Sequence, residues 1–273
     1  LTTVDMAGTG PTTGSLRLAK GSGKIAIQGD VLVLSGALFF NGANQIADGS
    51  TVTLQGGVID MNNRADRVAR FVIDGGSLIA SGGSTELLGA DVYELKSGAV
   101  NWSLRDVAGA ATSAMQKTGA GTATINGPGA IGSGHNFAGA TTVSAGTLVI
   151  GAAADINSTS GVTIDGATAA LRYNSGTALT QPLAFGAAGG TLGGTGAIGV
   201  AVAAGAGATL DPGNSVGSQA FTAGLTLGPD GAYHVELNDA DAAAGSGWDL
   251  LAVTGSLDVT ATASDPFTIK LTS

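Results

Sequence analysis

Residues 31–40 read VLVLSGALFF, residues 51–60 read TVTLQGGVID, and residues 71–80 read FVIDGGSLIA. Each stretch has an alternating apolar run, a glycine, and a second apolar run. Glycine-plus-apolar pairs recur at spacings of 20, 20 and 22 residues: Gly36/Leu38, Gly56/Val58, Gly76/Leu78 and Gly98/Val100. Alternation within a run is the period of a β-strand, and a longer repeat of about twenty residues is typical of a solenoid. The sequence therefore predicts an all-β fold, a single-stranded parallel β-helix (β-solenoid) of about 12 turns.

The glycines are expected at the corners of the turns, because corners need backbone angles that a β-carbon penalises. The apolar member of each pair is expected to point inward and to stack on its equivalents in neighbouring turns. The predicted inward stack consists of Leu38, Val58, Leu78 and Val100. By the same argument, Gly146 is expected at a corner in a conformation that a side chain would strain.

The composition suits one narrow, continuous core. Hydrophobic residues make up 44% of the 273 residues, whereas the chain has 47 glycines and 6 prolines. Since each turn of a solenoid is buried by its neighbours, no wide globular core is needed. We expect a single solenoid over residues 1–273, with less typical turns at 1–116. Cysteine is absent, which excludes disulfides and thiolate metal sites. No stretch is apolar enough for a membrane span.

The negative charge is concentrated in the second half of the chain. Residues 1–120 hold 9 basic and 10 acidic groups, whereas residues 121–273 hold 2 and 10. An acidic chain with 4% aromatic residues lacks the basic patches and stacking rings that nucleic-acid binding requires. We therefore expect no nucleic-acid partner, and we interpret the acidic half as a solvated surface that keeps the protein soluble outside the cell.

Two stretches in the second half resemble a known family. Residues 117–127 read KTGAGTATING, and residues 137–151 read FAGATTVSAGTLVIG. Together they resemble the passenger-associated repeat of autotransporters, with Ala123 where that family usually has leucine. Residues 190–196, 207–215 and 249–257 resemble the distal passenger of the same family. The resemblance covers residues 117–271, so we expect repeat-like turns over 117–273.

The resemblance implies a right-handed β-helix exported to the outer surface of a Gram-negative-type bacterium. The resemblance does not by itself imply an activity, and we expect neither enzymatic activity nor a cofactor. In that family the distal region also nucleates folding of the passenger during export, so an adhesin or passenger stalk with this autochaperone role is an alternative function.

One cluster of charged residues could bind an anionic ligand. Arg64, Arg67 and Arg70 lie three apart, beside Asp60 and Asp66. β-Helix lyases bind uronates with arginines and calcium-ligating aspartates, but they carry denser clusters and a proline that is missing here. We therefore favour a solvated loop projecting from one turn, and a polysaccharide-binding or polysaccharide-degrading β-helix is a further alternative. A groove shared by Asp60, Arg64, Arg67 and Asp91 would support it.

Other polar residues suggest no chemistry of their own. Asn238, Asp239 and Asp241, followed by Asp249, offer oxygen ligands for calcium, but they lack the spacing of an EF-hand. We interpret them as a polar corner loop. The histidines, His135 and His234, lie far apart, and no catalytic triad or zinc motif is present. We expect no catalytic residue and no metal.

The sequence best fits a non-enzymatic, extracellular structural module. The ends of a solenoid expose strand edges, which natural proteins normally cover. Phe267, Ile269 and Leu271 alternate in the last segment, so one face could complete the core while the edge pairs with another chain. Either further turns of a longer passenger cover these edges, or copies of the protein pair through them. We expect copies to associate end to end into a fibre or layer, with extracellular glycans as a second class of partner.

Overall fold

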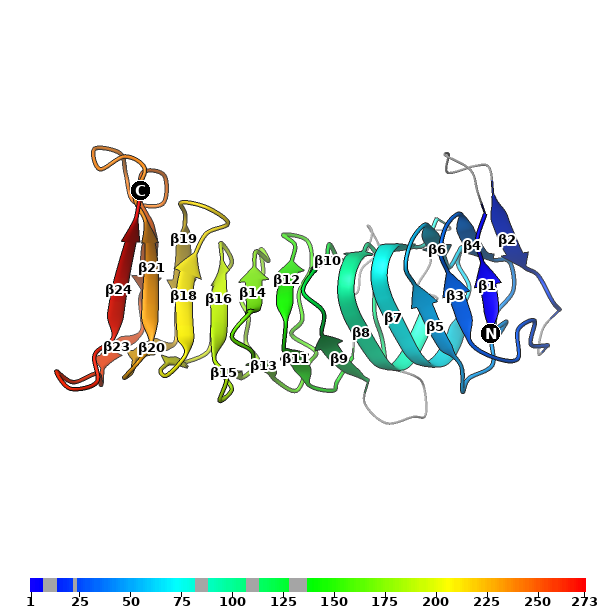
Figure 1. The fold of residues 1–273 in the computed structure, drawn as a ribbon, viewed down its shortest axis with the longest axis horizontal. Helices are drawn as coiled ribbons and strands as arrows, with labels where there is room; N and C mark the ends of the chain where they lie inside the picture. Colours follow the sequence, from blue (N-terminus) through cyan, green and yellow to red (C-terminus); the bar gives the residue numbers. More distant parts are fainter. Residues whose placement is uncertain (7–13, 22–23, 82–87, 107–112, 128–136) are drawn as a thin grey trace. The chain divides into compact units, whose positions relative to one another are not determined.

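A computed structural model describes residues 1–6, 14–21, 24–81, 88–106, 113–127 and 137–273 (Figure 1). These residues form β-strands joined by turns, without a helix, so the described part of the chain holds no helix that could cross a bilayer. The chain divides into two compact units, Leu1–Gly139 (unit 1) and Ala140–Ser273 (unit 2). The boundary lies beyond Lys117, where the resemblance to passenger repeats begins.

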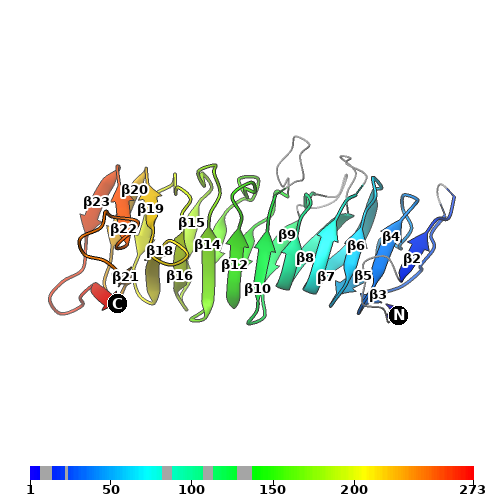
Figure 2. The ribbon, with the colours of Figure 1, turned by 90° about the horizontal axis from the view of Figure 1, so that it is seen from above.

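Unit 1 is a parallel solenoid with a strand on each of two faces in every turn. Its first face pairs β1, β3, β5, β7, β8 and β9 in this order. Its second face pairs β2, β4, β6, β7, β8 and β10, which lie side by side in Figure 2. The strands are β1 (Thr2–Val4), β2 (Ser15–Leu18), β3 (Val31–Val33), β4 (Ala37–Phe40), β5 (Thr51–Leu54), β6 (Val58–Asp60), β7 (Asp66–Ile79), β8 (Leu88–Val100), β9 (Ala114–Lys117) and β10 (Thr122–Ile125).

Unit 2 continues the same scheme and adds a third paired face. Its first face pairs β11, β13 and β15, and then β17, β20 and β23. Its second face pairs β12, β14, β16, β18, β21 and β24, and its third pairs β19 with β22. The strands are β11 (Thr141–Val143), β12 (Gly146–Ile150), β13 (Val162–Ile164), β14 (Ala169–Tyr173), β15 (Leu183–Phe185), β16 (Gly190–Gly194), β17 (Val202–Ala204), β18 (Ala208–Pro212), β19 (Ser218–Phe221), β20 (Gly224–Leu227), β21 (Ala232–Glu236), β22 (Leu250–Val253), β23 (Ser256–Val259) and β24 (Thr268–Thr272).

The predicted β-solenoid is therefore confirmed as the fold class. Over the described residues the regular solenoid has about 9 turns, fewer than the twelve expected. First-face pairing is interrupted between β15 and β17, and β17, β20 and β23 form a separate three-stranded sheet.

The inward stack predicted from the repeat is confirmed for Leu38, Leu78 and Val100 and is wrong for Val58. Leu38 pairs in register with Ile59, Ile59 with Leu78, and Leu78 with Val100. All four are at most 1% exposed. Val58 is instead aligned with Ala37 and Ser77 on the outer side and is half-buried. Ile59 therefore occupies the place predicted for Val58.

The error arises from the choice between two adjacent glycines. Gly57, not Gly56, is the corner of its turn, with a φ of 71°, like Gly36 at 73° and Gly76 at 64°. A β-carbon on Gly57 would collide with the carbonyl oxygen of Gly36 in the turn before. Because side chains alternate along a strand, moving the corner by one residue reverses which side chains point inward. Gly146, with a φ of 61°, is a corner as predicted.

A matched pair of substitutions tests this register. Ile59→Asp places an unpaired charge in the core and should lower the free energy of unfolding by several kcal/mol. Val58→Asp adds the same charge on the outer side and should cost about 1 kcal/mol or less. Chemical denaturation followed by circular dichroism measures both. Equal losses, or a larger loss for Val58→Asp, would contradict the register.

A lysine occupies the inner column of the first face. Leu54, Ile73 and Leu95 stack in register, and Lys117 takes the next position. Its side chain is fully buried, and Nζ donates to the carbonyl oxygens of Thr118 at 3.2 Å and Gly119 at 2.7 Å. Burial penalises the charged ammonium and lowers the pKa of Lys117 from 10.5 to about 8.

This buried amine should make stability depend on pH in the alkaline range. The unfolded chain holds the Lys117 proton up to its ordinary pKa of 10.5, whereas the folded protein releases it near 8. As pH increases from 8 to 10.5, the free energy of unfolding should therefore rise by about 3 kcal/mol. Below pH 8 both states hold the proton, and this gain is absent. Lys117→Met should remove the rise. The exposed Lys20, changed to Met, is the control that should retain it. Denaturation at a series of pH values measures the slope, and a flat wild-type profile would refute the assignment.

Candidate functional site

The predicted arginine cluster is separated by the solenoid into individual ion pairs. Nη2 of Arg67 lies 3.3 Å from Oδ1 of Asp91 on the next turn, and Nη1 lies 3.8 Å from Oδ2 of Asp48. Nη2 of Arg70 lies 2.7 Å from Oε2 of Glu94. Arg64 is exposed in the turn before β7. The positive charges of Arg67 and Arg70 are thus balanced by carboxylates, which weakens their attraction for an anionic ligand. The anion-binding patch stays a prediction.

Glu94 contacts Thr118 and Lys96 as well as Arg70. Burial alone would raise its pKa, but hydrogen bonds from Thr118 and Arg70 and the charges of Arg70 and Lys96 outweigh that effect and lower it. The Thr118 hydroxyl donates at 2.7 Å, and Nζ of Lys96 lies 4.0 Å away. This carboxylate is therefore ionised and bound by its neighbours, as expected of a cross-turn structural contact.

The two aspartates beside the arginines support backbone turns instead of facing a ligand. Oδ1 of Asp60 accepts the backbone N–H groups of Asn62 and Ser81, each at 2.9 Å. Oδ2 of Asp66 accepts those of Gln45 and Ile46 at 2.7 and 3.1 Å. Burial raises the pKa of Asp66 to about 6 despite these bonds. Asp60 and Asp66 are 6% and 4% exposed, so neither carboxylate is available in an open groove.

The candidate calcium ligands are not brought together. Asp249 is 1% exposed and points inward, where Oδ1 accepts the N–H of Gly217 at 2.7 Å and Oδ2 that of Glu236 at 2.8 Å. Asp239 is exposed and accepts the N–H of Asp241 at 2.9 Å. Across the described ranges, no three His, Cys, Asp or Glu side chains gather so that they could hold a metal ion. His135 lies outside the described residues.

Asp249 should therefore be a structural residue. Asp249→Asn replaces one acceptor oxygen with an N–H₂ group that faces a backbone N–H, and should lower the free energy of unfolding by about 1–3 kcal/mol. The control is Asp239→Asn at an exposed position, which should change it by about 0.5 kcal/mol or less. Thermal denaturation with added calcium and with a chelator measures both variants. An Asp249→Asn loss that is present in calcium and absent in the chelator would contradict this role.

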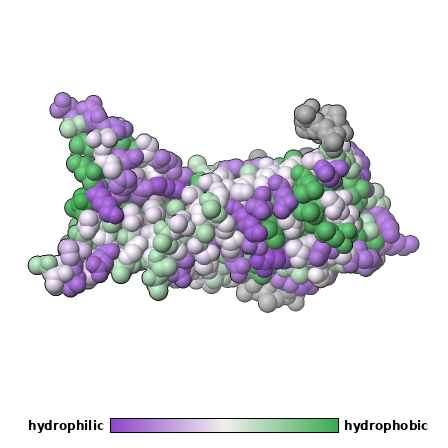
Figure 3. All heavy atoms as spheres, in the orientation of Figure 1, coloured by the Kyte–Doolittle hydropathy of each residue, from purple (hydrophilic) through white to green (hydrophobic). Residues whose placement is uncertain are grey.

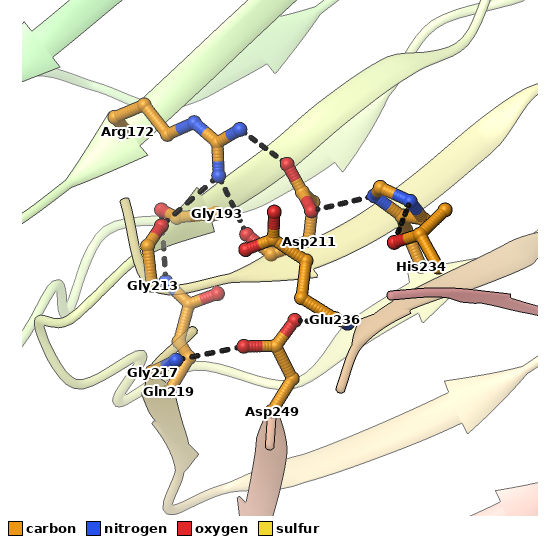
Figure 4. A network of polar contacts seen from close by, with 10 residues as sticks. Arg172, Gly193, Asp211, Gly213, Gly217, Gln219, His234, Glu236 and Asp249 are labelled. Atoms are coloured by element: carbon orange, nitrogen blue, oxygen red, sulfur yellow. Dashed lines mark hydrogen bonds and ion pairs between the residues drawn. The ribbon is translucent and has the colours of Figure 1, made fainter. Parts of the chain in front are cut away.

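His234 belongs to a polar network on the second face of unit 2 (Figure 4). Arg172 forms an ion pair with Oδ2 of Asp211, and Oδ1 of Asp211 lies 3.0 Å from Nδ1 of His234. Nε2 of His234 lies 3.1 Å from the Thr272 hydroxyl on β24. Since a carboxylate accepts hydrogen bonds, Nδ1 donates to Asp211, and in the neutral ring Nε2 accepts from Thr272. The network therefore ties the last strand to three earlier strands of the face.

The network depends on a residue without a side chain. In register, Arg172 faces Gly193 on β16, and Gly193 faces Asp211 on β18. A β-carbon on Gly193 would collide with Nη1 of Arg172. Its absence lets the guanidinium cross a whole turn and donate to the carbonyl oxygens of Asp211 and Gly213 at 2.7 and 3.0 Å. No local sequence pattern indicates this contact, because residues 172 and 211 come together only when the turns are aligned.

In the last turn of unit 2, apolar side chains that follow the inner columns are exposed to solvent. Leu148, Leu171, Leu192 and Leu210 form a buried inner column on the second face, which continues through Tyr233 to Ile269 on β24. Ile269 is 69% exposed. The other exposed side chains of the last turn are Leu271 on β24 and Leu257 and Val259 on β23, at 64%, 54% and 65%. Figure 3 shows hydrophobic atoms at the left edge, where β23 and β24 lie, between two projecting segments.

We call β23 and β24 the C-terminal edge. In the described residues, β23 pairs with β20 alone and β24 with β21 alone, so the far side of each backbone has no strand partner. Of the three residues predicted for self-association, Ile269 and Leu271 lie on this edge, whereas the half-buried Phe267 packs back on Gly231. Leu257 and Val259 were not predicted for this edge, although residues 256–259 alternate in the same way.

Comparisons with protein-family models, with curated proteins and with solved structures found no match to this chain. The resemblance of residues 117–271 to autotransporter passengers therefore rests on the sequence motifs alone.

Proposed function

We propose that this protein is a non-enzymatic, extracellular structural β-solenoid whose copies associate end to end into a fibre or layer. The C-terminal edge carries the proposal. Its side chains continue inner columns whose earlier members include the buried Leu192, Leu210 and Leu225, and its backbone offers hydrogen-bonding groups in the geometry of a parallel ladder. An edge of this kind recruits another strand unless something covers it.

The energetics favour covering this edge. Burying a Leu, Ile or Val side chain completely contributes about 1.5–3 kcal/mol, and four such side chains are more than half exposed here. Association also costs several kcal/mol in lost translational and rotational freedom. The apolar gain is of the size needed to offset that cost, and backbone hydrogen bonds add directionality.

The cell surface is the proposed location because of the passenger-like motifs of residues 117–271 and the acidic composition of the chain. A passenger stalk with a folding role is compatible with the same architecture. A polysaccharide enzyme has less support, because Arg67 and Arg70 are ion-paired and Asp60 and Asp66 are occupied by backbone N–H groups.

Two changes on the C-terminal edge test the proposal. Ile269→Asp with Leu271→Asp puts charges where apolar side chains should pack, so assembly should be lost while the preceding turns stay folded. Deleting residues 266–273 should have the same effect. Light scattering after gel filtration and electron microscopy measure assembly, and circular dichroism measures folding.

The control is Thr268→Asp on the same strand, which adds a charge at an exposed outward position and should retain assembly. A wild-type protein that stays monomeric at high concentration would overturn the proposal. So would a double variant that assembles as well as the wild type.

A further inference from the structure

We propose that the C-terminal edge binds the first turn of a second copy, with β1 adding to β23 and β2 adding to β24 in parallel. This inference rests on the proposed end-to-end association and specifies its polarity and register. The occupant is another copy of this chain, joined head to tail, because the two edges match in side-chain pattern and in charge.

The second-face strands at the two edges have the same pattern. Residues 15–18 read SLRL, and residues 268–271 read TIKL. In the chain itself, β2 adds to β4 with Leu16 on Leu38 and Leu18 on Phe40. Placing β2 on β24 in the same way sets Leu16 over Ile269 and Leu18 over Leu271. Both columns would then continue with aliphatic side chains, as they do inside the solenoid.

The first-face strands match at the same time. β1 ends in Val4, which is buried and stacks on Val33. Adding β1 to β23 sets Val4 over Val259 and Thr2 over Leu257. The outer side of β1, like that of β2, has no strand partner in the described residues. Parallel addition satisfies backbone groups on both faces at once, which a single mismatched strand could not do.

The charges of the two end turns are complementary. Residues 1–24 contain three basic residues and one acidic residue, whereas residues 236–273 contain six acidic residues and one basic residue. Arg17, Lys20 and Lys24 are exposed. The exposed acidic residues of the last turn are Asp239, Asp241, Asp258 and Asp265. Opposite potentials favour the head-to-tail arrangement, and tail-to-tail docking would set two acidic turns against each other.

The proposed register brings one pair of like charges together. The register sets Arg17 next to Lys270, both on the outward side. The guanidinium carbon of Arg17, however, lies 4.4 Å from the ring centroid of Phe39 on β4, so this side chain turns back over its own solenoid and away from the free edge. The stacking reduces the repulsion that a freely extended Arg17 would cause.

Cysteine cross-linking tests this polarity directly, because the chain has no cysteine of its own. Ser15 and Thr268 are both exposed and become neighbours in the proposed register. Adjacent strands lie about 4.8 Å apart, which is within the Cα separation that a disulfide spans. Ser15→Cys and Thr268→Cys proteins, each made separately, should form a mixed disulfide dimer when combined under oxidising conditions. Each alone should give no more dimer than Thr168→Cys, an exposed control in the turn before β14.

The outcomes separate this inference from the proposed function. A mixed dimer above the control level supports head-to-tail docking. If light scattering shows assembly but no mixed dimer forms, or Thr268→Cys alone forms dimers, the head-to-tail register is wrong. The proposed end-to-end association is then retained. Absence of assembly in the wild type and in every variant overturns both.

Discussion

In-register parallel pairing governs the core, the corners and the polar contacts of this protein. A strand satisfies its backbone groups with the equivalent strand of the next turn, so equivalent residues lie directly above one another. Leu38, Ile59, Leu78 and Val100 form such a column because their backbones pair, and the pairing is stable because their side chains fill the interior. The glycine corners follow from the same constraint. Gly36 and Gly57 come so close that a β-carbon on the second would meet the carbonyl of the first.

Turns between the strands leave backbone N–H groups that the ladders do not satisfy, and buried polar side chains satisfy them. Asp66 and Asp249 each bind backbone N–H groups of a neighbouring turn. Lys117 does the complementary task for two carbonyl oxygens. Burial shifts the pKa of Asp66 and of Lys117 toward neutrality, which is the cost of placing an ionisable group where the fold needs a donor or an acceptor. Buried aspartates and lysines are residue types that often form functional sites, yet the partners of these three side chains are backbone atoms.

Because strands pair with the next turn, a strand in an end turn has an unpaired edge that can bind another strand. An interior strand has a partner on each side, whereas among the described strands β24 pairs with β21 alone, and Ile269 is exposed although the leucines earlier in its column are buried. The network of Arg172, Asp211 and His234 holds this last strand to the turns before it, through Thr272. A firmly attached, apolar strand edge is a suitable template for another strand. The proposed association therefore uses the interaction that builds each unit.

The repeat, the fold class and most of the inward positions could be predicted from the sequence, because strand alternation and corner glycines depend on local chemistry. The sequence also indicated the last apolar strand through Ile269 and Leu271. The prediction placed the corner at Gly56, which was wrong; either glycine could form a corner, and only pairing with Gly36 selected Gly57 and turned Ile59 inward. Tertiary structure likewise decided the partners of the charged residues. Arg67 and Arg70 meet acidic residues about one turn away, Asp249 is buried, and Arg172 reaches Asp211 across Gly193. These contacts join residues that are distant in sequence and neighbours only after the turns stack, so no local pattern could specify them.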